Sequence, residues 1–180
     1  MKIQKTDIED LLVICPDVFP DERGYFFESW QKEKFRSLGL NRDFVQDNES
    51  MSMKGVLRGL HFQVPPYTQG KLVRVVRGEV LDVAVDLRKN SKTYGKWESF
   101  RLSDANKLMV FVPAGFAHGF LVLKDNTIFQ YKCTNYYNSG SESSIIWNDP
   151  DLAIDWGIEN PVVSEKDLKG MFFKDFSSPF

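Results

Sequence analysis

The chain has 180 residues, of which 42% are hydrophobic and 14% aromatic, a composition typical of one folded domain over residues 1–180 and not of a disordered segment. Its formal net charge of -2 argues against a general nucleic-acid binder, and its two histidines exclude any site that needs a histidine cluster. Cys15 and Cys133 are too far apart for a metal or redox motif. The first apolar run, residues 11–15, is far shorter than the ~20 residues that span a bilayer, so we expect a soluble, cytoplasmic protein without a membrane partner.

In chain order, short runs rich in β-forming residues are separated by Gly, Pro, Asn and Asp, a pattern typical of an antiparallel sandwich or barrel. The expected strands are residues 11–15, 24–28, 55–62, 71–76, 79–88, 97–102, 108–112, 118–123 and 127–134. We expect a helix over residues 30–38, with Ser29 at its N-cap and Gly39 after its end. Residues 164–168 are expected to open a short terminal helix.

The run 79–88 has the clearest strand pattern. Four of its hydrophobic residues fall at every second position and so share one face: Leu81, Val83, Val85 and Leu87. This alternation predicts a strand with one buried face, and we interpret Asp82 and Asp86 on the other face as structural acids. Arg77 and Gly78 predict a hairpin turn that joins this strand to the run 71–76.

Both histidines lie in glycine-containing motifs. His61 is part of Arg58-Gly-Leu-His-Phe-Gln63, and His118 follows a proline and a glycine in Pro113-Ala-Gly-Phe-Ala-His118. A lone histidine is more often structural than catalytic. Arg58 and His61 face opposite ways in a regular strand, so they converge only if the chain bends, which Gly59 permits.

The spacing Pro113-x-Gly-x-x-His118 resembles the second signature of the cupin superfamily, whose members are small jelly-roll barrels. In metal-binding cupins the first signature has His-x-His and, seven residues before a Gly, a Glu. Seven residues before Gly78 stands Lys71, and a cation at that place opposes metal binding. The resemblance implies an all-β, cupin-type jelly-roll barrel with a few short peripheral helices, and Lys71 favours chemistry without a metal or other cofactor.

Motifs along most of the chain resemble, in the same order, those of the dTDP-4-dehydrorhamnose 3,5-epimerase family. They are residues 21–28, 46–50, 55–63, 69–74, 82–88, 91–97, 113–120, 131–134, 147–150 and 164–167. There are two departures. Gly157 follows Asp-Trp where relatives usually have Pro, and the tail after Lys169 is short and rich in Phe. Both bear on where Lys166 and Asp167 are placed.

The resemblance implies an isomerase that inverts C3 and C5 of dTDP-4-dehydro-6-deoxy-D-glucose through an enolate, giving dTDP-4-dehydro-L-rhamnose on the route to dTDP-L-rhamnose. It implies His61 as the base and Asp167 as the carboxylate that pairs with it. It further implies Tyr131 as the general acid and Lys71 as the cation that faces the C4 oxygen. Without the resemblance, Asp167 is interpreted as a helix acid, Tyr131 as a strand aromatic and Lys71 as an exposed strand-end lysine.

The residues implied to bind the nucleotide sugar carry charges or amides suited to phosphates, hydroxyls and base edges. They are Arg23, Glu28, Gln46, Asp47, Asn48, Arg58, Lys71, His118, Glu142 and Lys166. Phe26 and Tyr136 are candidates to stack on the base. Relatives are homodimers in which strands cross between subunits, and we adopt that state by resemblance.

Three alternatives stay open. The first is an epimerase of one carbon only, C3 or C5, of a related nucleotide 4-keto sugar, and the sequence hardly separates it from the main interpretation. The second is a metal-dependent cupin oxygenase or isomerase, against which Lys71 and the missing His-x-His motif argue. The third is a catalytically inactive sugar-binding cupin, which the joint presence of His61, Lys71, Tyr131 and Asp167 disfavours.

Overall fold

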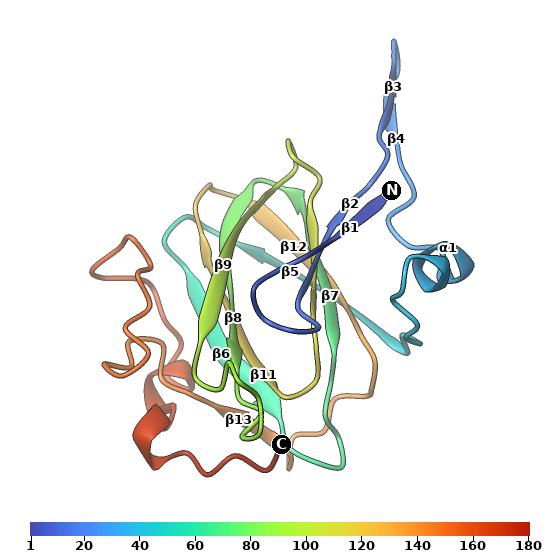
Figure 1. Cartoon of the computed structure of the whole chain (residues 1–180). Helices are drawn as coiled ribbons and strands as arrows, with labels where there is room; N and C mark the ends of the chain where they lie inside the picture. Colours follow the sequence, from blue (N-terminus) through green and yellow to red (C-terminus); the bar gives the residue numbers. More distant parts are fainter.

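The computed structural model describes residues 1–180 as a barrel of two antiparallel sheets (Figure 1). The first sheet contains, in spatial order, β1 (Lys2–Lys5), β2 (Leu12–Cys15), β10 (Met109–Val112), β7 (Lys71–Arg77), β12 (Thr127–Cys133) and β5 (Gln46–Ser52). The second contains β13 (Glu142–Ser144), β6 (Leu57–Gln63), β11 (Phe116–Val122), β8 (Glu79–Asp86) and β9 (Trp97–Ser103). A separate hairpin of β3 (Phe19–Asp21) and β4 (Gly24–Phe26) projects away from the barrel (Figure 1). The predicted all-β jelly-roll barrel is confirmed.

The helices are short and peripheral, as expected, but the first differs from its prediction. The helix α1 spans Lys32–Ser37, and its N-cap is Gln31, whose side chain accepts a hydrogen bond from the Lys34 N–H. The prediction of Ser29 as the cap is wrong because Trp30 lies outside the helix and packs its ring on Phe35 instead, at 4.5 Å between centroids. Near the C-terminus lie two 3-10 helices, η1 (Asp167–Lys169) and η2 (Phe173–Asp175). The longest helix, with six residues, does not reach the length of a membrane span.

The predicted hairpin between the runs 71–76 and 79–88 is wrong, because β7 and β8 belong to different sheets. The strand β7 pairs with β10 and β12, whereas β8 pairs with β9 and β11. Gly78 has a φ of +87°, and a Cβ there would lie 2.2 Å from Oγ1 of Thr127, so only glycine fits this turn. Gly78 therefore makes the corner where the chain passes from one sheet to the other.

The expectation of one buried face for 79–88 is also wrong, since both faces of β8 are covered. The face with Val83, Val85 and Leu87 packs under the segment that follows β13, which contributes Leu152 and Trp156. The opposite face looks into the barrel and is equally buried. The two aspartates of β8 are therefore interior groups: Asp82 and Asp86 are both fully buried.

A hydrophobic cluster fills only part of the barrel interior. Along β7, the inward positions change from Lys71 to Val73 and Val75, and the two valines join this cluster. Along β12, Phe129 belongs to the cluster and Tyr131 packs at its edge. One part of the barrel is thus a packed apolar core, and the other is lined by polar side chains.

Candidate active site

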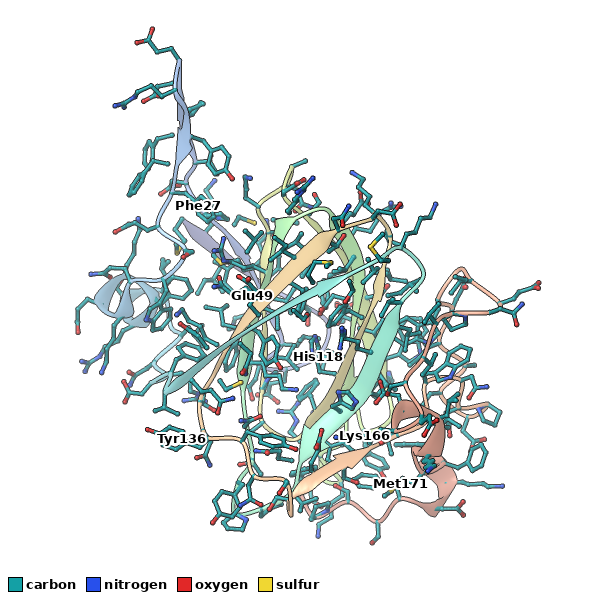
Figure 2. The ribbon with its side chains drawn as sticks, turned by 180° about the vertical axis from the view of Figure 1, so that it is seen from behind. Phe27, Glu49, His118, Tyr136, Lys166 and Met171 are labelled. Atoms are coloured by element: carbon teal, nitrogen blue, oxygen red, sulfur yellow. The ribbon has the colours of Figure 1, made fainter.

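The polar part of the barrel holds a cavity whose walls come from both sheets. Two adjoining hollows of about 220 and 240 Å³ share His61, Lys71, Tyr131 and Glu142 in their walls. Further predicted site residues line one or the other hollow: Gln46, Asn48, Arg58 and His118. His118 lies inside the barrel between the two sheets (Figure 2). Most of the predicted site residues are therefore brought to one place.

His61 and Asp167 form a close pair at this cavity. His61 Nε2 lies 2.5 Å from Oδ1 of Asp167, and Asp167 is only 4% exposed. Burial alone would raise the pKa of Asp167, but the hydrogen bond and charge of His61 and a bond from the Gly59 N–H outweigh it and lower that pKa. An ionised Asp167 holds the proton of His61 on Nε2. The other ring nitrogen, Nδ1, has no protein partner and is open to the cavity.

Gly59 makes the geometry of this wall possible. His61 pairs with His118 on β11, but Arg58 pairs with Phe120, so β6 carries one extra residue at this point. Gly59 has a φ of +117°, and a Cβ there would lie 2.5 Å from the Cα of Gly119. The predicted bend at Gly59 is confirmed, and it lets the cavity take side chains from both Arg58 and His61.

Lys71 contributes a cation that has no ionic partner in the chain. Its ammonium lies 5.8 Å from the centre of the Tyr131 ring and makes no salt bridge or hydrogen bond. Burial lowers the pKa of Lys71, and the negative charges around it, including Asp82 and Glu142, only partly oppose this effect. The charge of Lys71 is thus free to interact with a ligand in the cavity.

Tyr131 stands on the sheet opposite His61. Its hydroxyl has no protein partner and, like Nδ1 of His61, is open to the cavity. Burial raises the pKa of Tyr131, so the phenol stays protonated at neutral pH. The cavity therefore has a potential proton acceptor on one wall and a potential proton donor on the other.

A second His–Asp pair lies beside the first. His118 Nε2 is 2.8 Å from Oδ2 of Asp82, and both side chains are buried. From its sequence pattern alone, Asp82 is interpreted as a structural acid and is not expected in the site. The only signal in the sequence was an acid on the less apolar face of a strand, and that face turns out to look into the barrel.

At the rim of the cavity, Glu142 contacts two side chains. Lys166 is a predicted site residue and Tyr137 is not. Its carboxylate accepts a hydrogen bond from the Tyr137 hydroxyl at 2.7 Å and pairs with the Lys166 ammonium at 2.5 Å. Burial would raise the pKa of Glu142, but these two partners lower it. Lys166 reaches the rim from the C-terminal segment (Figure 2). The network thus fastens the segment that carries Asp167 to the barrel.

The amide side chains of β5 bond to one another inside the cavity. Gln46 Nε2 donates to Oδ1 of Asn48 at 3.0 Å, and Asn48 Nδ2 donates to Sγ of Cys133 at 3.6 Å. Asp47, between them, faces outward because side chains alternate along a strand, and it pairs with Lys132 at 2.9 Å. Of the predicted binding residues of β5, the chain brings Gln46 and Asn48 to the cavity but not Asp47.

Two further predicted binding residues lie outside the cavity of their own chain. Arg23 is at the tip of the projecting β3–β4 hairpin, 84% exposed, and bonds to Asp21. Glu28 pairs with Lys34 of α1 at 2.9 Å. The two candidate stacking aromatics, Phe26 and Tyr136, are also exposed, Phe26 by 66%. None of these side chains reaches the cavity from within the same subunit.

The side chains around the cavity do not form a metal site. No group of three or more His, Cys, Asp or Glu side chains in the chain is placed to hold a metal ion. Instead, the Nε2 of each histidine is hydrogen-bonded to a separate carboxylate. The arrangement suits acid–base chemistry by side chains next to a fixed positive charge.

Comparison with known proteins adds the chemical context. Residues 5–175 match the family described as dTDP-4-dehydrorhamnose 3,5-epimerase. A curated relative with that name from Shigella flexneri is 52% identical over 176 residues, which are 97% of each chain. The crystal structure of the enzyme from Elizabethkingia anophelis has a TM-score of 0.92 and 53% identity over 97% of each chain. A Legionella pneumophila structure in complex with dTDP-4-keto-L-rhamnose has a TM-score of 0.93 and 49% identity, over 98% of this chain and 94% of that one.

Proposed function

The chain belongs to the dTDP-4-dehydrorhamnose 3,5-epimerase family, and we propose that its cavity inverts C3 and C5 of dTDP-4-dehydro-6-deoxy-D-glucose to give dTDP-4-dehydro-L-rhamnose. The protein is an isomerase of nucleotide sugars. The observation that carries the detailed proposal is the His61–Asp167 pair facing Tyr131 across a cavity that also holds the unpaired Lys71.

The reaction begins with His61 as the base. Its Nδ1 takes the proton from a carbon next to the C4 ketone, and the electrons of that C–H bond form a C=C bond while the carbonyl π electrons move to the C4 oxygen. Asp167 stabilises the imidazolium that results. Lys71 stabilises the developing enolate oxygen, and electrostatic stabilisation of this kind is usually the largest single contribution to such a rate enhancement.

Tyr131 completes the inversion. Its hydroxyl gives a proton to the same carbon from the opposite face while the enolate re-forms the ketone. Proton exchange with water then returns His61 and Tyr131 to their starting states. Because C3 and C5 both neighbour the ketone, the same groups act at each carbon in turn, and no metal or other cofactor takes part in a step.

The test is proton exchange at the two carbons. Incubated in D2O with the 4-keto sugar nucleotide, the enzyme is expected to incorporate deuterium at C3 and at C5 with inversion at both. His61→Ala is expected to abolish both exchanges while dTDP still binds. Incorporation at one carbon only would identify the alternative, a single-carbon epimerase, and near-normal rates in His61→Ala would show that the base is wrongly assigned.

We also propose that the working enzyme is a cytoplasmic homodimer in which each hairpin arm completes the partner's site. The support is that Arg23 and Glu28 point away from their own cavity and that the arm exposes Phe19, Tyr25 and Phe26 to solvent. Large exposed aromatics on a projecting hairpin are typical of a surface that a partner covers. The cytoplasm is favoured by the two thiols, both of which are free.

Complementation between an inactive variant and a variant with weakened substrate binding tests the exchanged arm. In a heterodimer of one His61→Ala subunit and one Arg23→Ala subunit, an exchanged arm gives one fully wild-type site and one doubly altered site. At substrate concentrations well below the KM of Arg23→Ala, the purified heterodimer is therefore expected to be more active than either variant alone. No recovery from a verified heterodimer, or a monomeric mass in solution, would contradict the proposal.

A further inference from the structure

Burial of the Asp82 carboxyl group costs free energy, and the fold offsets this cost with few hydrogen bonds. It lies in β8, fully buried, between Phe120 on β11 and Phe100 on β9 in the sheet. Its Oδ1 is the only buried side-chain polar atom of the chain without a hydrogen-bond partner. Replacing both partners of a buried His–Asp or other charged pair by apolar residues of similar volume is often neutral or stabilising. Stability alone is therefore a poor reason for an acid at this position.

The one partner of Asp82 is His118. Its Nε2 lies 2.8 Å from Oδ2 of Asp82. The Phe129 ring is stacked near the imidazole, with 6.2 Å between the ring centroids. Nδ1 of His118 has no protein partner and is open to the cavity. The acid thus fixes which nitrogen of the imidazole faces the ligand.

This arrangement repeats that of the catalytic base. His61 and His118 are directly opposite each other on the neighbouring strands β6 and β11. Each has its Nε2 on a buried carboxylate, Asp167 in one case and Asp82 in the other, and each presents its Nδ1 to the cavity. Two His–Asp pairs therefore stand side by side on one wall.

We infer that Asp82 is a positioning residue for the reaction: it keeps the proton of His118 on Nε2, so that the unprotonated Nδ1 accepts a hydrogen bond from a hydroxyl of the bound sugar ring. The inference rests on the proposed function, because it takes the cavity to hold the sugar. Asp82 itself does not touch the substrate. It acts through His118, as Asp167 acts through His61.

The chain offers an unusually simple spectroscopic test, because it has only two histidines. In tag-free protein labelled with [15N]histidine, the ring nitrogen shifts of both residues are measured about two pH units above the ordinary imidazole pKa of about 6.5, where a free imidazole is neutral. The wild-type spectrum is expected to show a protonated Nε2 and an unprotonated Nδ1 for His118. Asp82→Asn and Asp82→Leu are the test variants, and Asp167→Asn is the matched control.

We expect the Asp82 variants to displace the His118 signals and leave those of His61 in place, and Asp167→Asn to do the reverse. We expect kcat to fall about tenfold or more, which corresponds to one lost hydrogen bond, with little change in the affinity for dTDP. A displaced His118 signal in either Asp82 variant supports the inference. Wild-type shifts that place the proton on Nδ1, or unchanged His118 signals in both variants, would overturn it. Failure of the proposed function is read separately, from the absence of C3 and C5 exchange in the wild-type enzyme.

Discussion

Gly170→Ala tests how closely the position of Asp167 is fixed by packing. Gly170 follows η1 directly, and a Cβ there would lie 2.6 Å from the backbone nitrogen of Ile146 and 2.8 Å from the carbonyl carbon of Ile145. These backbone atoms are tied to β6 from the other side, since the Ile145 N–H donates to the Leu60 carbonyl at 3.1 Å and the Ile145 carbonyl accepts from the Leu60 N–H at 3.3 Å. To reach an ordinary contact of about 3.4 Å, the segment must retreat by about 0.8 Å.

That displacement is large compared with the His61–Asp167 bond. Moved by the same amount, the 2.5 Å contact becomes about 3.3 Å, beyond the range of a strong charge-assisted hydrogen bond. Misplacement of catalytic groups by about 1 Å costs up to about a hundredfold in rate, so we expect kcat to fall about 10- to 100-fold. Overpacking of this kind costs about 1–3 kcal/mol of unfolding free energy. Binding of dTDP should change little.

The assay couples the product to a downstream NADPH-dependent reductase and follows NADPH loss, with thermal unfolding measured on the same samples. Gly140→Ala is the matched control, because a Cβ there meets only a side-chain atom, Oδ1 of Asn138, at 3.3 Å. The control should keep the wild-type rate. A folded Gly170→Ala enzyme with a rate within twofold of the wild type would show that packing of this segment does not set the position of Asp167.

Three further predictions follow from the same site. Burial lowers the pKa of Lys71 and raises those of Tyr131 and Cys133. As the pH rises, the reaction rate should therefore fall at a pH below the ordinary lysine pKa, because the Lys71 ammonium loses its proton there. A rate that stays unchanged up to the ordinary lysine pKa would contradict the role of Lys71. Tyr131→Phe keeps the base but removes the acid, so deuterium should still enter the substrate in D2O without inversion; inversion at the wild-type rate would exclude Tyr131 as the acid. Arg23→Ala should weaken dTDP binding by about tenfold or more, as expected for the loss of one charge-assisted hydrogen bond. Titration calorimetry measures this affinity, and an unchanged value would show that the β3–β4 hairpin does not contribute to the site.

The strands were predictable where hydrophobic residues alternate and were missed where they do not. The run 127–134 was expected as a strand and contains β12, but its neighbour β5 was missed. The strand β5 is polar and lies at the edge of its sheet, so half of its residues face solvent and no apolar alternation marks it. The corner at Gly78 shows a second limit: a turn signal tells where the chain changes direction but not which strands pair.

The site shows the same limits at longer range. The bend at Gly59 was predicted from local chemistry, because only glycine permits it. Asp167 lies 106 residues from His61 in the sequence, and only the resemblance to a family put the two together. Asp82 was not recognised because burial of both faces of β8 depends on the C-terminal segment, which the strand's own sequence does not reveal.

In the proposed reaction, His61 removes the proton from both carbons next to the ketone, and the fate of those two protons can be followed in one experiment. Proton NMR of the 4-keto sugar nucleotide in D2O, with the wild-type enzyme and with His61→Ala, follows the loss of the C3 and C5 proton signals and the configuration of the product. The wild type is expected to lose both signals and to yield the doubly inverted sugar, and His61→Ala is expected to lose neither. Retention of either signal with the wild type, or loss of both with His61→Ala, would contradict it.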